Sequence, residues 1–489
     1  MNRLANQTAA SMLQNLESRA ISARELLDQH LEVVDSLNED INAIVTLDVE
    51  RATEQANEVD RQRASGEPLG PLAGLPMTLK DSISTQGLLT TAGSEMLAGY
   101  IPEHDADVAV RLKDAGAVIF GKTNVPEFAG DIQTYNKLFG VTNNPWSHEH
   151  TAGGSSGGAA AALATGMSAL EVGSDIAGSI RIPASHCGVV GHKPSYGIVS
   201  QLGHIPGAPG SLSRSDLGVL GPMARTVEDC SLLLDVLAGP DRWCASGWEL
   251  VLPKPSVTHV SDLKLAVCVE NDYSPLSDDV HKSVLDIAND LHEQGATVGY
   301  DVIPPQLRLK EYASIYWDLL GSVLSQSYPP EIYDQIVASV EAGEIPPGGL
   351  ALYGPQGVII RHRDWLALNE ARQKVRASFA EFFQQWDCIL MPSSATAAIK
   401  HDHSEPLTER TIEVNGQEHN YVAQMSWILP ASFAYLPATT VPIAKNSIGL
   451  PIGVQVVGPY LADKTCLEVG RMIEQISGGH AGLSNDVIL

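Results

Sequence analysis

The stretch between residues 66 and 181 constrains the fold most, because short apolar runs, helical stretches and glycine-rich turns alternate along it. Residues 76–80, 117–121 and 168–172 each read as a short buried strand. A helical pattern lies between the first two strands, and an alanine-rich helix precedes the third. This alternation predicts an α/β fold with a mixed or mostly parallel sheet.

The flanking parts of the chain add helices and strands to this core. Helical spacing predicts two helices at residues 8–35 and 49–64, and residues 306–385 read as mostly helical. Residues 387–392 and 439–457 read as strands. No linker rich in glycine, serine or proline divides the chain, so we expect a single domain. Its predicted parts, within residues 1–489, are N-terminal helices (8–64), a core (about 65–240 and 386–477) and a variable helical insert (about 241–385).

The charge balance and the cysteine spacing argue against several classes of protein. The chain has 31 Lys and Arg residues against 58 acidic ones, a net charge of −27, so we expect no nucleic-acid or anionic-membrane partner. Its six cysteines form no CxxC pair, which argues against a zinc site or a disulfide framework. The N-terminus lacks a signal-peptide pattern and no run of about 18 apolar residues occurs, so we expect a cytoplasmic location.

The first glycine-serine segment, residues 153–158 (GGSSGG), runs directly into the alanine-rich helix. One interpretation is a flexible turn whose serine caps that helix. A phosphate-binding loop is a second, but the Lys-Ser/Thr pair of that motif is absent. A third is the G-x-S-x-G nucleophile elbow, with Ser155 as nucleophile and Asp387 and His401 or His403 as its partners. That motif is short and matches by chance in a glycine-rich chain.

The second segment, residues 173–181 (GSDIAGSIR), follows a predicted strand. Small residues just before a serine can present successive backbone N–H groups to an oxyanion that develops during a reaction. Asp175 and Arg181 are spaced to form an ion pair that braces this loop. Ser179 alone would carry no functional signal.

Lys80 ends an apolar strand, where a buried ammonium must be paired or neutralised. Burial lowers the pKa of a lysine and can make it a general base. The local sequence alone favours a plainer interpretation, in which Lys80 pairs with Asp81 or reaches solvent.

Taken together, these segments resemble the amidase signature family. Its glycine- and serine-rich core pattern is GGSSGGAAAALATGMSALEVGSDIAGSIRIPASHCGVVGHKPSYG, residues 153–197. The resemblance extends over about residues 8–477 and implies a single amidase-signature domain with a central mixed sheet covered by helices. The outlying matches are PLAGLPMTLKD (71–81), GKTNVPEFA (121–129), LGPMARTVEDCSLLLDVLAG (220–239) and LPIGVQVVGP (450–459).

The resemblance implies a Ser–cis-Ser–Lys triad. Lys80 matches the base, Ser155 the bridging serine at a cis peptide bond, and Ser179 the nucleophile, 24 residues later. The implied chemistry is acyl transfer: Lys80 takes a proton from Ser155, which takes one from Ser179 as that serine attacks a carbonyl carbon. No metal or organic cofactor is implied.

The loop around the nucleophile supplies the other residues that the resemblance implies. Many family members have three glycines before the nucleophile, whereas this chain has Ala177 in the middle of that run. Backbone donors survive the change, so we still expect activity. Ile182 stands where transfer-RNA-dependent amidotransferase subunits often have glutamine, which argues against that role. The implied oxyanion hole is the backbone of Ile176, Ala177, Gly178 and Ser179, and the loop supports are Ser156, Asp175 and Arg181.

Specificity in this family comes from loops outside the core. The segments 130–146, 204–216 and 306–360 are therefore expected to line the entrance. Aromatic side chains could form an acyl pocket there, although ordinary packing is the commoner role of such residues. The candidate substrate contacts are Gly130, Asp131 and Gln133, and the aromatic candidates are Tyr316, Trp317, Trp427, Phe433 and Tyr435.

Three functional hypotheses follow. The first is a stand-alone hydrolase of small amides, aryl amides or carbamates, with esterase or urethanase activity as an extension. The alternative is the amidase subunit of a transfer-RNA-dependent amidotransferase, which needs a partner protein. The third is a catalytically inactive binding protein, which the intact Lys80, Ser155 and Ser179 set argues against. A small-molecule substrate is the expected partner, and a homodimer is left open.

Overall fold

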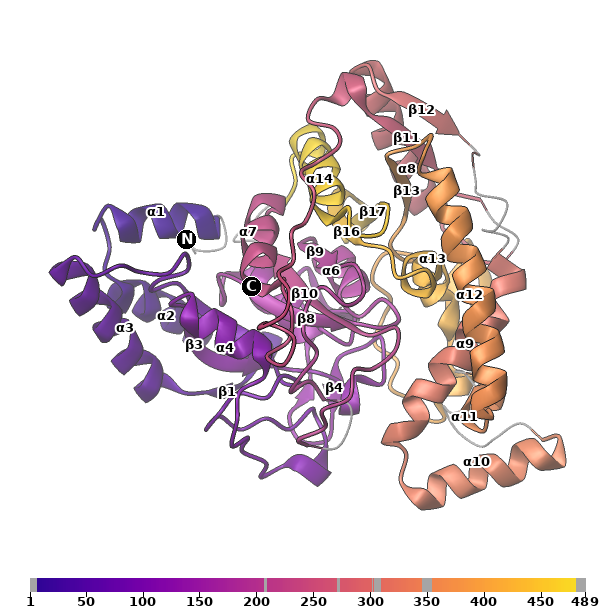
Figure 1. The fold of residues 1–489 in the computed structure, drawn as a ribbon, viewed down its shortest axis with the longest axis horizontal. Helices are drawn as coiled ribbons and strands as arrows, with labels where there is room; N and C mark the ends of the chain where they lie inside the picture. Colours follow the sequence, from indigo (N-terminus) through magenta and orange to yellow (C-terminus); the bar gives the residue numbers. More distant parts are fainter. Residues whose placement is uncertain are drawn as a thin grey trace.

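The chain folds around a mixed sheet of eight strands, shown in the computed structural model of Figure 1. The structure describes residues 7–205, 209–270, 273–300, 302, 309–344 and 354–480. The strand order is β12-β11-β13-β17-β16-β9-β10-β8, so segments distant in sequence lie side by side. β12, β11 and β13 run parallel, and each other neighbouring pair is antiparallel. The predicted α/β fold with a mixed central sheet is confirmed.

The eight strands come from both halves of the sequence. β9 and β10 are neighbours in the sheet, as are β16 and β17, and β10 separates β9 from β8. β11, β12 and β13 form the end of the sheet away from β8. The bounds are β8 Glu171–Asp175, β9 Val190–Lys193, β10 Val219–Ala224, β11 Lys264–Val267, β12 Thr297–Tyr300, β13 Cys388–Pro392, β16 Ala438–Lys445 and β17 Pro451–Val457. Three two-stranded hairpins lie outside this sheet: β4 Tyr135–Asn136 with β5 Gly140–Val141, β6 Asn143–Asn144 with β7 Ser147–Thr151, and β14 Thr411–Val414 with β15 Gln417–Asn420.

Lys80 lies in a separate three-stranded sheet. In this sheet β3 (Val118–Thr123) pairs antiparallel with β1 (Ile44–Leu47) and parallel with β2 (Pro76–Lys80). All five residues of β2 are buried, and β2 packs against β8 of the large sheet. The strand therefore delivers the Lys80 side chain to the contact between the two sheets.

Two groups of helices flank the sheets at opposite sides of Figure 1. The N-terminal group is α1 (Ala9–Glu17), α2 (Ala23–Ile41) and α3 (Val49–Ser65), and the other is α9 (Leu309–Leu324), α10 (Pro330–Ala342), α11 (Pro355–Val358) and α12 (His362–Phe382). The remaining helices of four or more residues in an α conformation are α4 Asp107–Asp114, α5 Gly157–Thr165, α6 Arg181–Cys187, α7 Val227–Leu237, α8 Asp278–Glu293, α13 Leu429–Phe433 and α14 Asp463–Ser477. No helix in the described ranges has the length and apolar character needed to cross a bilayer.

Two sequence predictions need correction at the level of elements. The helix predicted at 8–35 is two helices, because Ser22 starts α2 with a capping box: its side chain accepts the Glu25 N–H while the Glu25 carboxylate accepts the Ser22 N–H. The strand predicted at 168–172 is β8, which starts and ends three residues later at Glu171–Asp175. The first three residues of the second glycine-serine segment, 173–175, are therefore strand, and only its later part is a loop.

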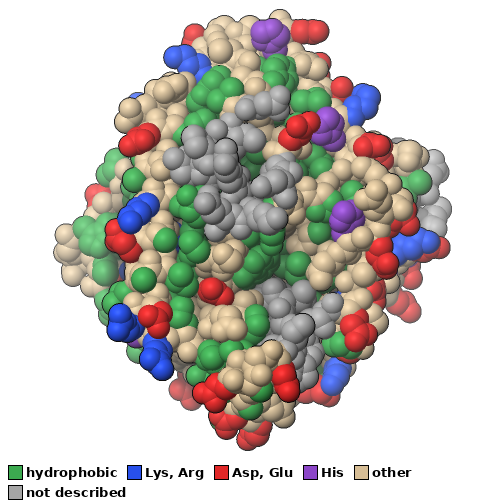
Figure 2. Space-filling view, turned by 90° about the vertical axis from the view of Figure 1, so that its right-hand side faces the viewer, with side chains coloured by type: hydrophobic (Ala, Val, Ile, Leu, Met, Phe, Trp, Pro, Cys, Tyr) green, Lys and Arg blue, Asp and Glu red, His purple; other side chains and the backbone are tan. Residues whose placement is uncertain are grey.

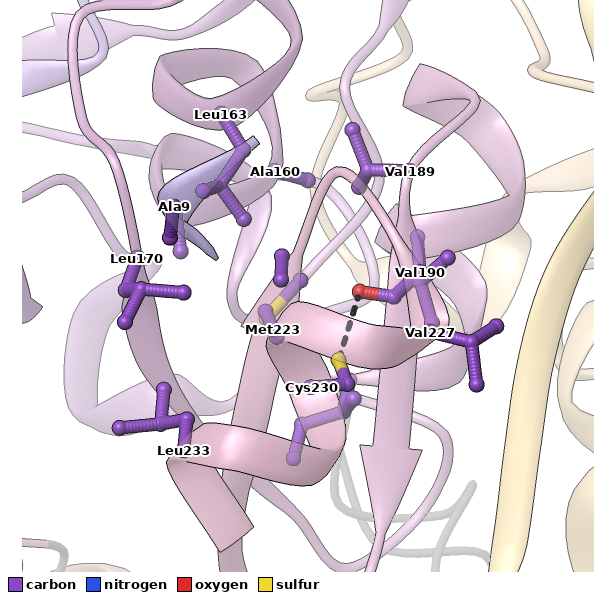
Figure 3. Close-up of a cluster of buried hydrophobic side chains, with 14 of the residues drawn as sticks. Ala9, Ala160, Leu163, Leu170, Val189, Val190, Met223, Val227, Cys230 and Leu233 are labelled. Carbon is purple, nitrogen blue, oxygen red and sulfur yellow. Dashed lines mark hydrogen bonds between the residues drawn. The ribbon is translucent and has the colours of Figure 1, made fainter. Parts of the chain in front are cut away.

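The helix that follows the first glycine-serine segment, α5, is buried along its whole length. Its small residues allow this, since a Cβ at Gly158 would lie 2.4 Å from the backbone nitrogen of Asn124. Figure 3 shows Ala160 and Leu163 of α5 beside side chains of β9, β10 and α7, among them Met223. This apolar cluster fixes α5 and hence the serines at its N-terminal end.

Two apolar clusters meet at the second glycine-serine segment. Ile180 belongs to the cluster that contains the N-terminal helices, whereas Ala177 and Ile182 belong to the one that contains α9 and α12. The loop that carries Ser179 is therefore held from both sides.

Candidate active site

The two glycine-serine segments lie against each other. The Ser156 N–H donates to the Ser179 carbonyl oxygen at 3.1 Å. The peptide bond between Gly154 and Ser155 is cis, as the family resemblance implies. Gly153 has a φ of +80°, and a Cβ there would lie 2.8 Å from the backbone of α6, so only glycine fits this approach.

The Lys80 amine lies among three hydroxyl groups. Its Nζ is 2.7 Å from Ser155 Oγ, 2.9 Å from Ser156 Oγ and 2.9 Å from Ser174 Oγ. Lys80 is fully buried, and the Asp81 carboxylate is bonded to Thr91 instead, so the plainer interpretation of Lys80 is wrong. Sequence reasoning does not single out Ser174, because its contact depends on how β2 packs against β8.

Burial lowers the pKa of Lys80 to about 7, although the charges of Asp175 and Glu171 oppose that shift. A neutral amine has two N–H donors and one lone pair. Three hydroxyl neighbours satisfy such an amine if two accept from it and the third donates to the lone pair. The site therefore suits a neutral Lys80 that receives a proton from a serine.

The second step of the predicted relay has no hydrogen bond in this structure. Among the described residues, the hydroxyl of Ser179 has no hydrogen-bond partner, and in particular it is not bonded to Ser155 Oγ. Ser179 is 6% exposed as a whole residue, so it is almost fully buried. The roles of Ser155 and Ser179 stay predictions.

The predicted oxyanion hole needs one correction. The Gly178 N–H donates to Asp175 Oδ1 at 2.9 Å, because the carboxylate at the end of β8 folds back over the loop. This N–H is therefore not available to a substrate oxygen here. The N–H groups of Ile176, Ala177 and Ser179 make no backbone hydrogen bond within the described chain, so they remain the candidate donors.

Asp175 and Arg181 form the predicted ion pair, with Nε and Nη2 each 3.0 Å from the carboxylate. Both side chains are fully buried. Burial by itself would raise the pKa of Asp175, but Arg181 and the N–H donors outweigh it and lower the pKa to about 2. Arg181 also donates to Gln455 Oε1 at 3.0 Å and to Ser432 Oγ at 2.7 Å. The pair thus ties residues 176–180, which carry the predicted nucleophile Ser179 and are called the nucleophile loop below, to α13 and β17.

The predicted substrate contacts lie next to the cis peptide bond, since a Cβ at Gly154 would be 2.8 Å from the backbone of residues 131–133. The side chains of Asp131 and Gln133, however, already have partners. Asp131 accepts from Arg410 at 2.7 Å and from Tyr421 at 2.6 Å. Gln133 donates to the Asp402 carbonyl at 2.7 Å, and the Gly130 N–H donates to the Glu127 carbonyl at 3.0 Å. No sequence signal links residues so far apart in the chain.

The histidine-based elbow has no support in the geometry. Asp387 accepts from the Lys264 N–H at 2.9 Å, whereas the ring of His401 lies 5.3 Å from that of His403. In the described part of the chain the hydrogen-bond partner of Ser155 Oγ is Lys80, not a histidine. Groups of three or more metal-binding side chains are also absent from the described ranges.

The five aromatic candidates are all buried in the cluster that contains α9 and α12. Tyr316 reaches the loop directly, since its hydroxyl donates to the Ile176 carbonyl at 2.9 Å. Trp427 is fully buried and donates to the Pro275 carbonyl, so packing accounts for it. Figure 2 views the side of the insert helices, where hydrophobic side chains gather around the hollow in the middle of the face.

A family model described as Amidase matches residues 25–467. Among curated relatives, a glutamyl-tRNA(Gln) amidotransferase subunit of Synechococcus sp. (strain CC9902) is 34% identical, covering 96% of each chain. The same protein of Moorella thermoacetica (strain ATCC 39073 / JCM 9320) is 33% identical, covering 97% of each.

Solved structures share the fold over nearly the whole length. The 6-aminohexanoate cyclic dimer hydrolase complexed with substrate has a TM-score of 0.79 and 26% identity, covering 100% of each chain. A chain from a vestigial protein complex related to an s-triazine catabolic enzyme has a TM-score of 0.80 and 29% identity, covering 98% of this chain and 100% of that one.

Proposed function

The chain belongs to the amidase family, and from this premise we propose that it cleaves the C–N bond of an amide through an acyl-enzyme formed on Ser179. The observation that carries the proposal is the buried amine of Lys80, held by three hydroxyls beside the segment that bears Ser179. A buried amine with a pKa near neutrality is suited to general-base catalysis.

The proposed reaction proceeds by two linked proton transfers. Neutral Lys80 takes the proton of Ser155, and Ser155 takes that of Ser179 as Ser179 Oγ bonds to the carbonyl carbon. The N–H groups of Ile176 and Ala177, with that of Ser179, donate to the oxyanion, and each such donor is typically worth about 3 kcal/mol of barrier. The proton returns to the leaving amine as the C–N bond breaks, and water then hydrolyses the ester.

We propose an uncharged, apolar or aryl acyl group for the stand-alone enzyme. Two ion pairs are already formed around the site, Asp175 with Arg181 and Asp131 with Arg410. Ile182, which packs with the loop, is apolar. A charged substrate would therefore find no unpaired partner among these four charged side chains. Burying a charge without such a partner is unfavourable.

The amidotransferase subunit is the second candidate, and the curated relatives favour it over the stand-alone enzyme. The two relatives described above carry that name at 34% and 33% identity over nearly the full chain. A glutamine donor would bring an ammonium and a carboxylate to the site, and a partner protein would receive the ammonia. The paired charges around the loop are what favour the first candidate.

A substrate panel with purified chain separates the two candidates. Release of amine from p-nitroacetanilide or from a carbamate ester, lost in Ser179→Ala, would support the stand-alone amidase. Release of ammonia from glutamine, with no turnover of the aryl amide, would support the amidotransferase subunit. Failure of a fluorophosphonate to label Ser179 would contradict both and leave the binding-protein hypothesis.

A further inference from the structure

Glu171, the first residue of β8, is a fully buried carboxyl group outside the predicted triad. Its Oε1 accepts a hydrogen bond from Thr78 Oγ1. Its Oε2 has no hydrogen-bond partner among the described residues. A buried carboxyl group with so few donors is costly, so its presence calls for a reason.

The position of this carboxyl group places it beside the amine of the relay. Thr78 lies two residues before Lys80 on β2, so their side chains project from the same face of that strand. On β8, Ser174 follows Glu171 by three residues and accepts from Lys80 Nζ at 2.9 Å. The two strands belong to different sheets and face each other at this contact. Glu171 and Lys80 thus share one dry interface.

We propose that Glu171 is a positioning residue whose charge sets how firmly Lys80 holds its proton, and therefore the pH range in which the relay works. The inference rests on the proposed function, because it assigns a regulator to the same general base. Glu171 acts through Lys80 and need not contact the substrate.

The other charged groups around Lys80 cannot supply this pH dependence. Asp175 is held ionised by Arg181 and raises the pKa of Lys80 at every working pH. His204 also faces the amine, but burial lowers its pKa to about 3, so it stays neutral. Neither group changes charge near neutral pH.

The charge of Lys122 on β3 also acts on Glu171. Lys122 donates to the Ile83 carbonyl and to Thr85 Oγ1, and burial lowers its pKa to about 8. Asp81 faces Lys122 in turn, and burial raises its pKa to about 6. Lys122 therefore favours the ionised form of Glu171, against the effect of burial.

The two groups titrate over neighbouring ranges. Burial raises the pKa of Glu171 to about 8 and lowers that of Lys80 to about 7. Groups that interact in this way lose protons as a pair. As Glu171 ionises, its negative charge favours the ammonium form of Lys80 and makes the amine a stronger base. Without that charge, Lys80 would be deprotonated at lower pH and would be a weaker base.

The test compares Glu171→Gln with wild type and with Glu474→Gln. Glu474 is a matched control on α14, where burial raises its pKa to about 7 and its carboxylate accepts the Val227 N–H. The readouts are kcat/KM against pH on an amide that wild type turns over, and the rate of Ser179 labelling by a fluorophosphonate against pH. In Glu171→Gln we expect the acid limb of both profiles to move down by a few tenths of a pH unit, because a carboxyl group with a pKa of about 8 is only partly ionised there, and we expect a severalfold lower plateau above about pH 8. Glu474→Gln should keep the wild-type limb.

Thr78→Val provides a second variant that keeps the carboxyl group. Removing the hydroxyl removes a donor that favours the ionised carboxylate, so the limb should move in the same direction by a smaller amount. Limbs of Glu171→Gln and Thr78→Val that superimpose on that of wild type would overturn the inference alone. Wild-type protein that is never labelled at Ser179 would overturn the proposed function itself.

Discussion

At the residue scale, Lys80 shows how burial selects a proton acceptor. Water would hold an ammonium in this position, but the interior replaces water with the hydroxyls of Ser155, Ser156 and Ser174. These groups can serve as donors or acceptors, so they satisfy the neutral amine as well as the charged one. Two carboxylates nearby prevent the pKa from falling further than about 7.

Replacing Lys80 with methionine should remove the proton acceptor while keeping the volume of the side chain. We expect kcat/KM to fall by about 10²–10⁴, the usual contribution of a general base. In wild type, kcat/KM should fall as the pH drops below about 7, because Lys80 then holds its proton. Lys193→Met is the matched control, since this buried lysine has a pKa of about 7 but donates to the carbonyls of Pro194 and Leu436. It should keep the pH limb, and an unchanged rate in Lys80→Met would contradict the mechanism.

The Arg181–Asp175 pair gives a stability prediction. Arg181→Gln leaves a buried carboxylate without its cation, so the free energy of unfolding should fall by about 3–5 kcal/mol at pH 7. The folded pKa of Asp175 is about 2, below its ordinary 3.8, so the pair stabilises the fold above about pH 4 and loses this effect as the pH falls toward 2. Denaturant unfolding of both proteins should therefore differ less at pH 3 than at pH 7. A difference that does not change with pH would contradict this account.

At the element scale, the conformation of the nucleophile loop depends on a glycine at position 178. Gly178 has a φ of +97°, and a Cβ there would lie 2.7 Å from Ile182 Cδ1. Its N–H is also bound by Asp175. The loop therefore cannot move at this residue without disturbing α6, which begins at Arg181.

Gly178→Ala should both destabilise the fold and slow the reaction. Positive φ costs an alanine about 1–2 kcal/mol, and the contact with Ile182 adds to that cost. Gly197→Ala is the control, because Gly197 has a φ of +90° but nothing within 4 Å of its Cβ position. We expect the control to lose stability through strain alone and to keep kcat/KM, measured on the same amide. Equal effects on kcat/KM in both variants would show that the contact with Ile182 is unimportant.

Local patterns predicted the elements better than their assembly. Strand β2 and helix α5 follow from short apolar and alanine-rich runs, which report burial directly. The sequence does not reveal that β2 leaves the large sheet, because strand pairing depends on partners distant in the chain. For the same reason the Asp131–Arg410 pair, 279 residues apart, had no signal. The triad candidates were identified through a family resemblance, since no spacing alone selected Lys80.

At the scale of the whole molecule, an ion pair between Arg372 and Asp216, here called the latch, joins α12 to the core. Arg372 of α12 donates to Asp216 at 2.8 Å, and its guanidinium lies 4.5 Å from the ring of Tyr435. Tyr435 in turn donates to Asp216 and stacks on Tyr196 at 4.2 Å. Because α9 and the nucleophile loop share an apolar cluster, the position of these helices shapes the site.

Breaking this latch should alter substrate binding more than chemistry. In Arg372→Met the Asp216 carboxylate loses its buried cation while the apolar volume remains, so α12 and α9 should pack less firmly. We expect KM for an aryl amide to rise severalfold and limited proteolysis to cleave the 309–382 helices faster, whereas fluorophosphonate labelling of Ser179 keeps its rate. Arg376→Met is the control, because Arg376 also lies over Tyr435, at 5.0 Å, but has no ion pair with a described acidic residue. A KM change of the same size in both variants would assign the effect to the ring contact, and loss of labelling in Arg372→Met would show that the latch supports the nucleophile loop itself.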